Sequence, residues 1–320
     1  GYSKLCKSKK NQEKYVIKVL FTNQADDFAP RYTERISKLV HPCICHICSY
    51  NTFNHDINLL LPYFENGNLT SAIQADIKHK PPKWWDTTCK MKAMYGIAVG
   101  MAYLHSENVF HRNLTTNNIL FDNNYEIKIS DIGCVQLFDY KDIPHHNFTL
   151  SRCFTTAPEI LTGRYFDDKS DVYSFSYILY EILCRESFIK FIRQSPSSLP
   201  VEEIVHKNRR PQINPRDFPY DNQYLQLMEQ CWDAEASFRP SFSEIADFFK
   251  ENPIRGTNLD QFRMYVQKVD IKFDVKPKFQ TILPTPVKLE INSPPKYNFR
   301  FSTPVAEIKT EVIDLDIEEI

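Results

Sequence analysis

The sequence predicts an α+β fold, because extended apolar segments and segments with helical periodicity both occur along its 320 residues. Apolar residues 119–121 face Ile127 and Ile129 across a polar turn at residues 123–124, which is the pattern of a β-hairpin. Between residues 94 and 104, apolar side chains recur at three- and four-residue intervals, which is typical of an amphipathic helix. With 42% hydrophobic and 25% charged residues, the chain can bury one large core and still has length for a tail.

The charge balance favours no particular polyanionic partner. The formal net charge is -1, so we expect neither nucleic acid nor a membrane surface as a partner. No apolar run approaches the ~20 residues that span a bilayer, and no leader with a basic start and an apolar centre occurs. We therefore expect a cytoplasmic or nuclear protein. The first residue is Gly1 rather than Met, so we also expect a fragment or a processed product.

A group of cysteine and histidine residues at positions 41–48 has the composition of a metal site. On a strand, Cys43 and Cys45 would share one face, while His46 and Cys48 would share the other. This spacing favours small buried thiols that behave as hydrophobic residues, with a zinc site as the alternative.

The stretch from residue 111 to residue 133 carries the main candidate site. The predicted hairpin brings the loop before it beside the tripeptide after it, which places Asn118 and Asp131 in one cleft with Asn113 beside them. An amide oxygen and a carboxylate that converge in this way suit a hard cation carrying phosphates.

This stretch resembles the catalytic and metal-binding segments of protein kinases, whose pattern is His-Arg-Asp-Leu-x-x-x-x-Asn followed by Asp-Phe-Gly. The residues that match this pattern are His111, Arg112, Leu114, Asn118, Asp131 and Gly133. The resemblance implies ATP and magnesium as cofactors, with Asn118 and Asp131 on the metal and His111, Arg112 and Gly133 in structural roles. Asn113 stands where the family keeps its catalytic aspartate. An amide cannot accept a proton as a carboxylate does, and general bases typically contribute ~10²- to 10⁴-fold to the rate.

Other nucleotide-site positions follow from the same resemblance. Residues 15–18 look like the family's third strand, whose lysine holds the α- and β-phosphates. Counting back from that strand, the end of the glycine-rich loop falls at the first residues of the chain, so we expect the first strand to be missing. The implied cofactor-binding residues are Lys18 on the strand, Ser3 in place of the third loop glycine, Val16 beside adenine, Leu61 at the back of the pocket, and Tyr63 and Phe64 in the hinge.

Two charged residues of active kinases have no counterpart. The spacing predicts a helix over residues 26–40, and the helix glutamate that pairs with the strand lysine aligns with Tyr32. Glu34 lies two positions further, about 200° around the helix, so it would face away. Thr115 stands where serine/threonine kinases usually carry a lysine.

Later motifs complete the resemblance in family order. Ala157-Pro158-Glu159 matches the end of the activation segment, and Asp171 matches the aspartate that holds the catalytic loop. Arg239 lies in a signature of the tyrosine-kinase-like group and is expected to form a buried ion pair with Glu159. Between Asp131 and Glu159, the hydroxyl groups that could accept phosphate belong to Tyr140, Thr149, Ser151, Thr155 and Thr156.

The resemblance implies a bilobal kinase-like fold with a small, mostly β lobe and a large, mostly α lobe. We place the lobes at residues 1–66 and 67–256, a further helix at 257–269, and an extended or disordered tail at 270–320, because prolines recur there. The tail ends in alternating apolar and acidic residues, 311–320, which resemble motifs that bind small ubiquitin-like modifiers. A purely solvated tail is the alternative.

Three functions fit these observations. The first is a pseudokinase that acts as a signalling or scaffold module through protein partners, with residual binding of ATP and magnesium. The second is an active atypical serine/threonine kinase acting on a protein substrate, in which water or a nearby side chain carries the proton. The third is a scaffold that acts through its C-terminal tail.

Overall fold

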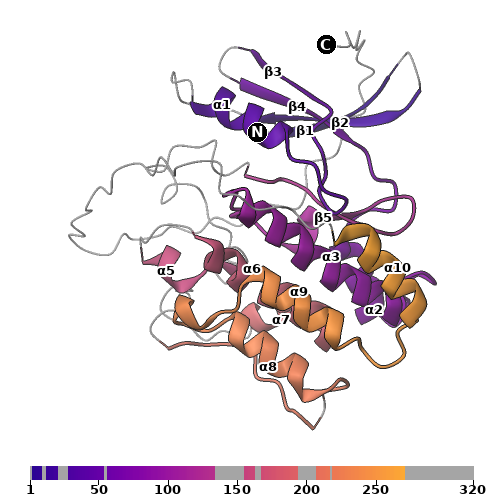
Figure 1. Ribbon diagram of the computed structural model, residues 1–320, viewed down its shortest axis with the longest axis vertical. Helices are drawn as coiled ribbons and strands as arrows, with labels where there is room; N and C mark the ends of the chain where they lie inside the picture. Colours follow the sequence, from indigo (N-terminus) through magenta and orange to yellow (C-terminus); the bar gives the residue numbers. More distant parts are fainter. Residues whose placement is uncertain are drawn as a thin grey trace.

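A sheet with one helix is followed along the chain by a larger helical body in the computed structural model (Figure 1). The structure describes residues 2–8, 12–20, 28–53, 56–133, 155–162, 167–193, 207–216 and 218–270. Together with the match reported below, this arrangement agrees with the predicted bilobal α+β fold. No helix of the described ranges is long and apolar enough to cross a membrane.

The small lobe contains an antiparallel four-stranded sheet in the order β1-β2-β4-β3. Its strands are β1 (Tyr2–Lys7), β2 (Lys14–Leu20), β3 (Ser49–Phe53) and β4 (Asp56–Pro62). Helix α1 (Phe28–Ser37) ends earlier than the predicted residue 40. At its end the backbone N–H groups of Lys38 and Leu39 donate to the carbonyl oxygens of Arg35 and Ile36, each at 3.2 Å, so the last turn is tighter than an α-helix.

Helix α3 (Thr87–Ser106) runs through the middle of the large lobe. The residues predicted to form its apolar stripe are all buried, but so are Tyr95 and Gly96 on other sides of the helix. The prediction of an amphipathic helix was therefore too narrow. The neighbours of α3 leave little of its surface to solvent, and they are α6 (Asp168–Cys184), α9 (Phe242–Glu251), α10 (Leu259–Val269) and strand β6 (Ile127–Ile129).

The other helices of the large lobe lie before and after α3 in the chain. They are α2 (Leu69–Ile77), α5 (Pro158–Leu161), α6 (Asp168–Cys184), α7 (Phe188–Arg193), α8 (Asn222–Cys231), α9 (Phe242–Glu251) and α10 (Leu259–Val269). Capping boxes begin α6, at Asp167 and Ser170, and α9, at Ser241 and Glu244. Helix α10 lies within the range 257–269 for which the sequence predicts a further helix.

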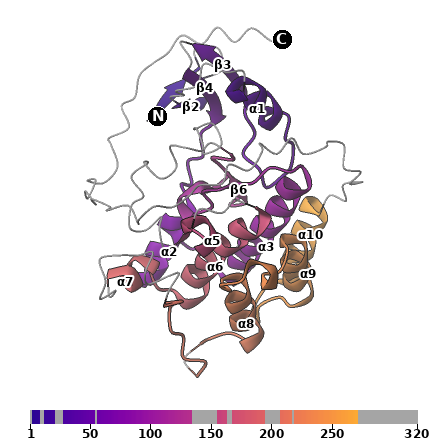
Figure 2. The same ribbon diagram turned by 90° about the vertical axis from the view of Figure 1, so that its left-hand side faces the viewer.

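Strands β5 (Ile119–Phe121) and β6 (Ile127–Ile129) form the predicted hairpin, which lies between the sheet and the helical body (Figure 2). Ile119 pairs with Ile129 and Phe121 with Ile127, and all four side chains are buried. The carboxylate of Asp122 accepts hydrogen bonds from the backbone N–H of Asn124 and Glu126, both at 2.9 Å, and so closes the turn. The predicted hairpin is confirmed.

Residues 41–48 form a turn with a single bridge residue, Ile44, so the strand assumed for this segment was wrong. Cys43 and Cys45 are buried, while Cys48 is exposed. Among the residues that the structure describes, no group of three or more His, Cys, Asp or Glu side chains could hold a metal ion.

Candidate functional site

Asp171, in the first turn of α6, holds the loop that begins at His111. Its carboxylate accepts hydrogen bonds from the backbone N–H of His111 and Arg112, both at 2.8 Å, and contacts His105 Nε2 at 3.0 Å. Burial raises the pKa of Asp171, but the contacts with His105 and His111 outweigh burial, so the pKa is lowered and the carboxylate stays ionised. Arg112 adopts a left-handed backbone conformation, with φ 61°, in this loop.

His111 connects the loop to the end of β6. Its Nδ1 accepts a hydrogen bond from the backbone N–H of Asn113 at 3.3 Å, and its Nε2 lies 2.8 Å from the carbonyl oxygen of Ser130. Burial lowers the pKa of His111, so the ring is neutral, with the proton on Nε2. This bond attaches the loop that begins at His111 to Ser130, the residue before Asp131.

The three central candidates come together as the sequence predicts. Asn118 Nδ2 donates to the carbonyl oxygen of Asn113 at 2.8 Å, and the backbone N–H of Ser130 donates to the carbonyl oxygen of Asn118 at 2.8 Å. Because the amide nitrogen of Asn118 is used in this bond, its Oδ1 is the side-chain atom that could ligate a cation. Asp131 follows Ser130 directly.

Lys18 and Asp131 form an ion pair between the two lobes. Lys18 Nζ lies 2.6 Å from Asp131 Oδ1, and the two side chains are only 19% and 24% exposed. Lys18 comes from β2, whereas Asp131 follows β6 and has a left-handed backbone, with φ 62°. The candidate phosphate-binding lysine and the candidate metal-binding carboxylate therefore contact each other directly.

Tyr32, which the family resemblance aligns with the glutamate of active kinases, lies on α1 close to Gly133. Its ring is buried and lies against Gly133, where a Cβ would be only 2.8 Å from Tyr32 Cε1 and would also clash with the hydroxyl. Gly133 additionally has φ 62°, which favours glycine. Glu34 instead pairs with Lys38 at 2.7 Å on the exposed side of the helix, as its spacing predicts.

The predicted nucleotide-binding residues of the small lobe lie along adjacent strands. Ser3 in β1 is opposite Lys18 in β2, and Val16 in β2 is opposite Leu61 in β4. Tyr63 and Phe64 follow β4 in the connection to the large lobe, where the backbone N–H of Tyr63 donates to the carbonyl oxygen of Lys14 at 3.3 Å.

A cavity of about 140 Å³ lies beside the catalytic loop and contains an acid that the sequence analysis missed. Glu181 of α6 accepts a hydrogen bond from Thr116 Oγ1 at 3.2 Å, and Thr70 Oγ1 donates to Thr116 Oγ1 at 2.7 Å. Burial raises the pKa of Glu181. An acidic residue within the apolar part of α6 was the available signal for this position.

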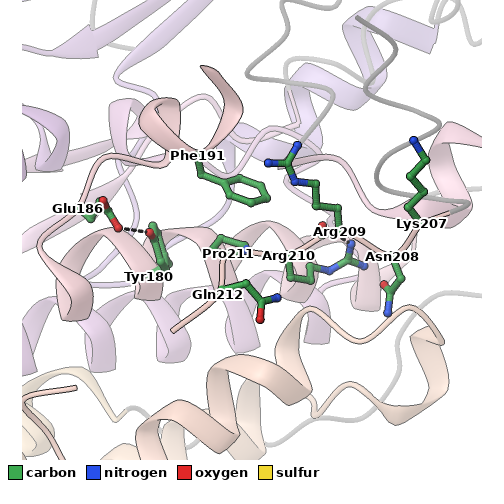
Figure 3. Close-up of a pocket in the computed structure, with 9 residues that line it drawn as sticks. All are labelled: Tyr180, Glu186, Phe191, Lys207, Asn208, Arg209, Arg210, Pro211 and Gln212. Carbon is green, nitrogen blue, oxygen red and sulfur yellow. Dashed lines mark hydrogen bonds between the residues drawn. The ribbon is translucent and has the colours of Figure 1, made fainter. Parts of the chain in front are cut away.

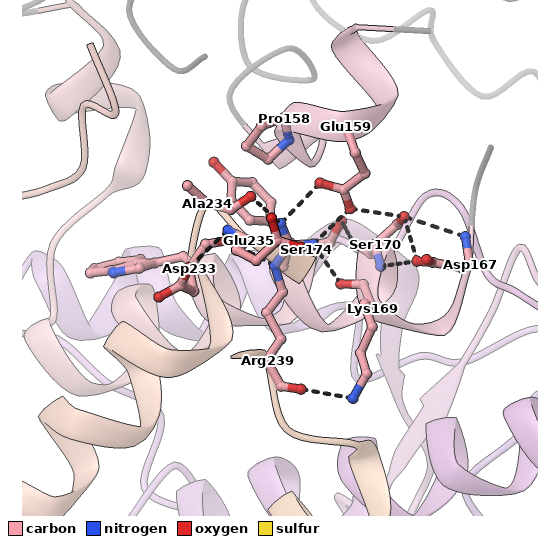
Figure 4. Close-up of polar contacts among 12 residues, drawn as sticks. Pro158, Glu159, Asp167, Lys169, Ser170, Ser174, Asp233, Ala234, Glu235 and Arg239 are labelled. Atoms are coloured by element: carbon pink, nitrogen blue, oxygen red, sulfur yellow. Dashed lines mark hydrogen bonds and ion pairs between the residues drawn. The ribbon is translucent and has the colours of Figure 1, made fainter. Parts of the chain in front are cut away.

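Glu159 and Arg239 form the predicted buried ion pair (Figure 4). Arg239 Nη1 and Nη2 donate to the two carboxylate oxygens of Glu159 at 2.7 and 2.9 Å, and the arginine is only 1% exposed. The guanidinium also donates to the carbonyl oxygens of Asp233, at 2.8 Å, and Lys169, at 3.0 Å. The pair thus connects α5 to the segment before α9.

The larger pocket, about 490 Å³, lies elsewhere and is lined by none of the predicted site residues (Figure 3). Two of its arginines already stack on aromatic rings: Arg209 on Phe191, at 4.9 Å, and Arg210 on Tyr173, at 5.1 Å. Of the predicted hydroxyl positions, Tyr140, Thr149 and Ser151 lie outside the described residues, as does the tail from 271 to 320.

The side chains of this site are of the chemical types that bind a magnesium–nucleotide complex. Lys18 supplies a cation for phosphate, while Asp131 and Asn118 supply the carboxylate and amide oxygens that Mg²⁺ prefers. Of the described residues expected to bind the metal or phosphates, Asp131 supplies the carboxylate, and Lys18 pairs with it.

Comparison with known proteins gives matches to protein kinases. A family model described as protein tyrosine and serine/threonine kinase matches residues 1–249. The chain is 30% identical over 221 residues to the dual specificity testis-specific protein kinase 2 of Mus musculus, covering 68% of this chain and 36% of that protein. It is 27% identical over 259 residues to the probable serine/threonine-protein kinase kinX of Dictyostelium discoideum, covering 80% of this chain and 22% of that protein. The chain thus spans well under half the length of these relatives.

Proposed function

Because the chain belongs to the protein kinase family, we propose that it is a catalytically impaired member, a pseudokinase, that acts as a signalling or scaffold module with residual binding of ATP and magnesium. The observation that carries the proposal is the placement of Asn113. Its backbone is held by His111 and Asn118 at the position where the family keeps its catalytic aspartate. The loop that would present a general base is therefore intact in its contacts, but it presents an amide.

The residues divide into two groups with different capacities. Lys18 would bind nucleotide phosphates, and Asn118 and Asp131 would hold a magnesium ion that neutralises phosphate charge. The side chain of Asn113 can hydrogen bond to a hydroxyl group but cannot remove its proton. Thr115 also supplies no positive charge for a transferred phosphoryl group, and such transfer depends on positioning and charge stabilisation.

A thermal-shift titration with ATP tests the binding part of the proposal. We expect stabilisation by ATP with magnesium, since a ligand that binds only the native state raises the apparent stability. Lys18→Met should abolish the shift, whereas Lys38→Met, which removes an exposed lysine of α1, should leave it unchanged. No shift with wild-type protein well above millimolar ATP would show that the site does not bind nucleotide usefully.

A phosphotransfer assay tests the catalytic part. We expect no turnover by the wild-type chain above the level of Asp131→Ala. In Asn113→Asp, a regained general base should raise any measurable rate by ~10²-fold or more.

The second candidate function is an active atypical serine/threonine kinase. Lys18, Asn118 and Asp131 favour it, because the groups for phosphates and metal are all retained. A loose transition state demands little from a base, so water could accept the proton. Turnover by the wild-type chain that Asp131→Ala abolishes would establish this function and contradict the pseudokinase proposal.

The C-terminal tail supports a third, separate proposal, which is the binding of a small ubiquitin-like modifier by residues 311–320. An extended apolar and acidic segment can add to the edge of a partner's sheet. The test compares binding of the purified modifier to the full chain and to a chain ended at Asp270, which keeps the ion pair of Asp270 with Lys250. Equal binding of the modifier by the two chains would exclude the tail as its binding site.

A further inference from the structure

The ion pair between Lys18 and Asp131 joins the two groups that a magnesium–nucleotide complex would use separately. At 2.6 Å the contact is direct, and both side chains are largely shielded from solvent. A charge pair in such a setting is screened less than one in bulk water. Phosphates that bind Lys18 must therefore compete with a carboxylate that is already in place.

Tyr32 determines which acid is available to Lys18. The tyrosine side chain reaches the Asp131–Gly133 turn and contacts Gly133 closely, and it carries no charge that could draw the lysine away. The nearest acid on the same helix, Glu34, is turned to the exposed side and pairs with Lys38. Lys18 thus pairs with Asp131, while Glu34, an acid of the described part of α1, pairs elsewhere.

The backbone of the turn supports the same arrangement. Asp131 and Gly133 both have positive φ, 62° in each case. The ring of Tyr32 fills the space that a side chain at position 133 would need. The turn that begins at Asp131 is therefore packed against α1 at Gly133.

We propose that Asp131, held in place by Tyr32, acts as an internal competitor for the phosphates of a nucleotide, so that magnesium must take Asp131 before Lys18 becomes available to the ligand. This inference rests on the proposed nucleotide binding and concerns its regulation. Tyr32 is then a positioning residue. Asp131 weakens the binding of metal-free nucleotide and strengthens the binding of the magnesium–nucleotide complex.

Calorimetric titration with ATP in the presence of a chelator, and again in excess magnesium, tests the competition. In Asp131→Asn the amide neither holds Lys18 as strongly nor repels phosphate, so metal-free ATP should bind at least about tenfold more tightly than to wild type. Magnesium should strengthen binding to wild type but add little to the variant. Metal-free binding by Asp131→Asn that is equal to or weaker than that of wild type would overturn the inference.

A second measurement requires no nucleotide. Crystal structures of Tyr32→Glu and the matched control Tyr32→Phe should differ in the partner of Lys18. We expect Lys18 to contact the introduced carboxylate in the first variant and Asp131 in the second. If Lys18 still pairs with Asp131 in the Tyr32→Glu structure, the proposed role of Tyr32 is wrong. If no protein binds ATP under any condition, the proposed nucleotide binding fails, while the crystal structures still decide which acid holds Lys18.

Discussion

Tyr265 of α10 lies directly against Gly96 of α3, where any larger residue would clash with the tyrosine hydroxyl and with Ile127 Cγ1 at 2.9 Å. The same hydroxyl lies 3.5 Å from the thiol of Cys43 in the segment that follows α1. Lys268 of α10 also pairs with Glu126 at 2.6 Å. Helix α10 follows the residues matched by the family model, yet it is packed into the core of the large lobe.

Gly96→Ala should destabilise the protein by ~1–3 kcal/mol, because overpacking a close contact shifts its neighbours. Chemical denaturation measures the change. Tyr265→Phe removes the nearest atom, so the double variant should lose less stability than the sum of the two single variants. A gain of ~1 kcal/mol in Gly96→Ala, as expected from helix propensity alone, would contradict the close contact.

Arg239→Met should destabilise the protein by ~3–5 kcal/mol, since it leaves the carboxylate of Glu159 buried without its partner. Glu159→Gln in the same chain should recover part of this loss. The control is Lys38→Met, which breaks an exposed pair and should change stability by less than ~1 kcal/mol. Similar losses in both variants would show that the buried pair has no special role.

Acid should destabilise the fold through His41 between about pH 6.5 and pH 4. Burial is the main cause that lowers the pKa of His41 to about 4; the charge of Lys128 acts in the same direction, and a backbone hydrogen bond with Val269 opposes both. The folded state then binds fewer protons than the unfolded state, so stability is complete above pH 6.5 and is lost as the pH falls towards 4. Buried His111 acts in the same direction.

His41→Asn should flatten this pH dependence, while its amide oxygen replaces Nδ1 as the acceptor for the backbone N–H of Cys43. Free energies of unfolding measured at pH 7.5, 6 and 5 provide the comparison. Parallel curves for the variant and wild type would contradict the assignment to His41.

Asp171→Asn should destabilise the protein by ~1–3 kcal/mol, because an amide nitrogen would replace one acceptor of the bonds to His111 and Arg112. Hydrogen exchange at these two backbone amides should accelerate more than exchange in α3. Asp168→Asn, also in the first turn of α6, removes only a favourable helix-terminus charge and should cost less than ~1 kcal/mol.

Local sequence pattern was sufficient for the hairpin at β5 and β6 and for the placement of Asn113, Asn118 and Asp131. These features depend on alternation and on short separations, which a sequence shows directly. The pairing of Glu159 with Arg239 spans 80 residues and came from the family resemblance alone.

Contacts between distant elements were not predictable in this way. The contact between Lys18 and Asp131 depends on how the lobes meet, and the packing of Tyr265 on Gly96 depends on the path of the chain after α9. Gly96 and Gly100 lie four residues apart on α3 and so mark a face open to close approach. Nothing in the sequence identifies which segment makes that approach.

The bridge between Ile44 and Ile129 has a mechanical consequence. The backbone N–H of Ile129 donates to the carbonyl oxygen of Cys43 at 2.8 Å, and the carbonyl oxygen of Ile129 accepts from the backbone N–H of Cys45 at 2.9 Å. These two bonds join the segment after α1 to β6. The chain joins the lobes a second time after β4. Val40 and Cys43 also contact Tyr103 and Tyr265 of the large lobe. The segment after α1 should therefore move with the large lobe, so that any change in the distance between Lys18 and Asp131 comes from movement of the sheet alone.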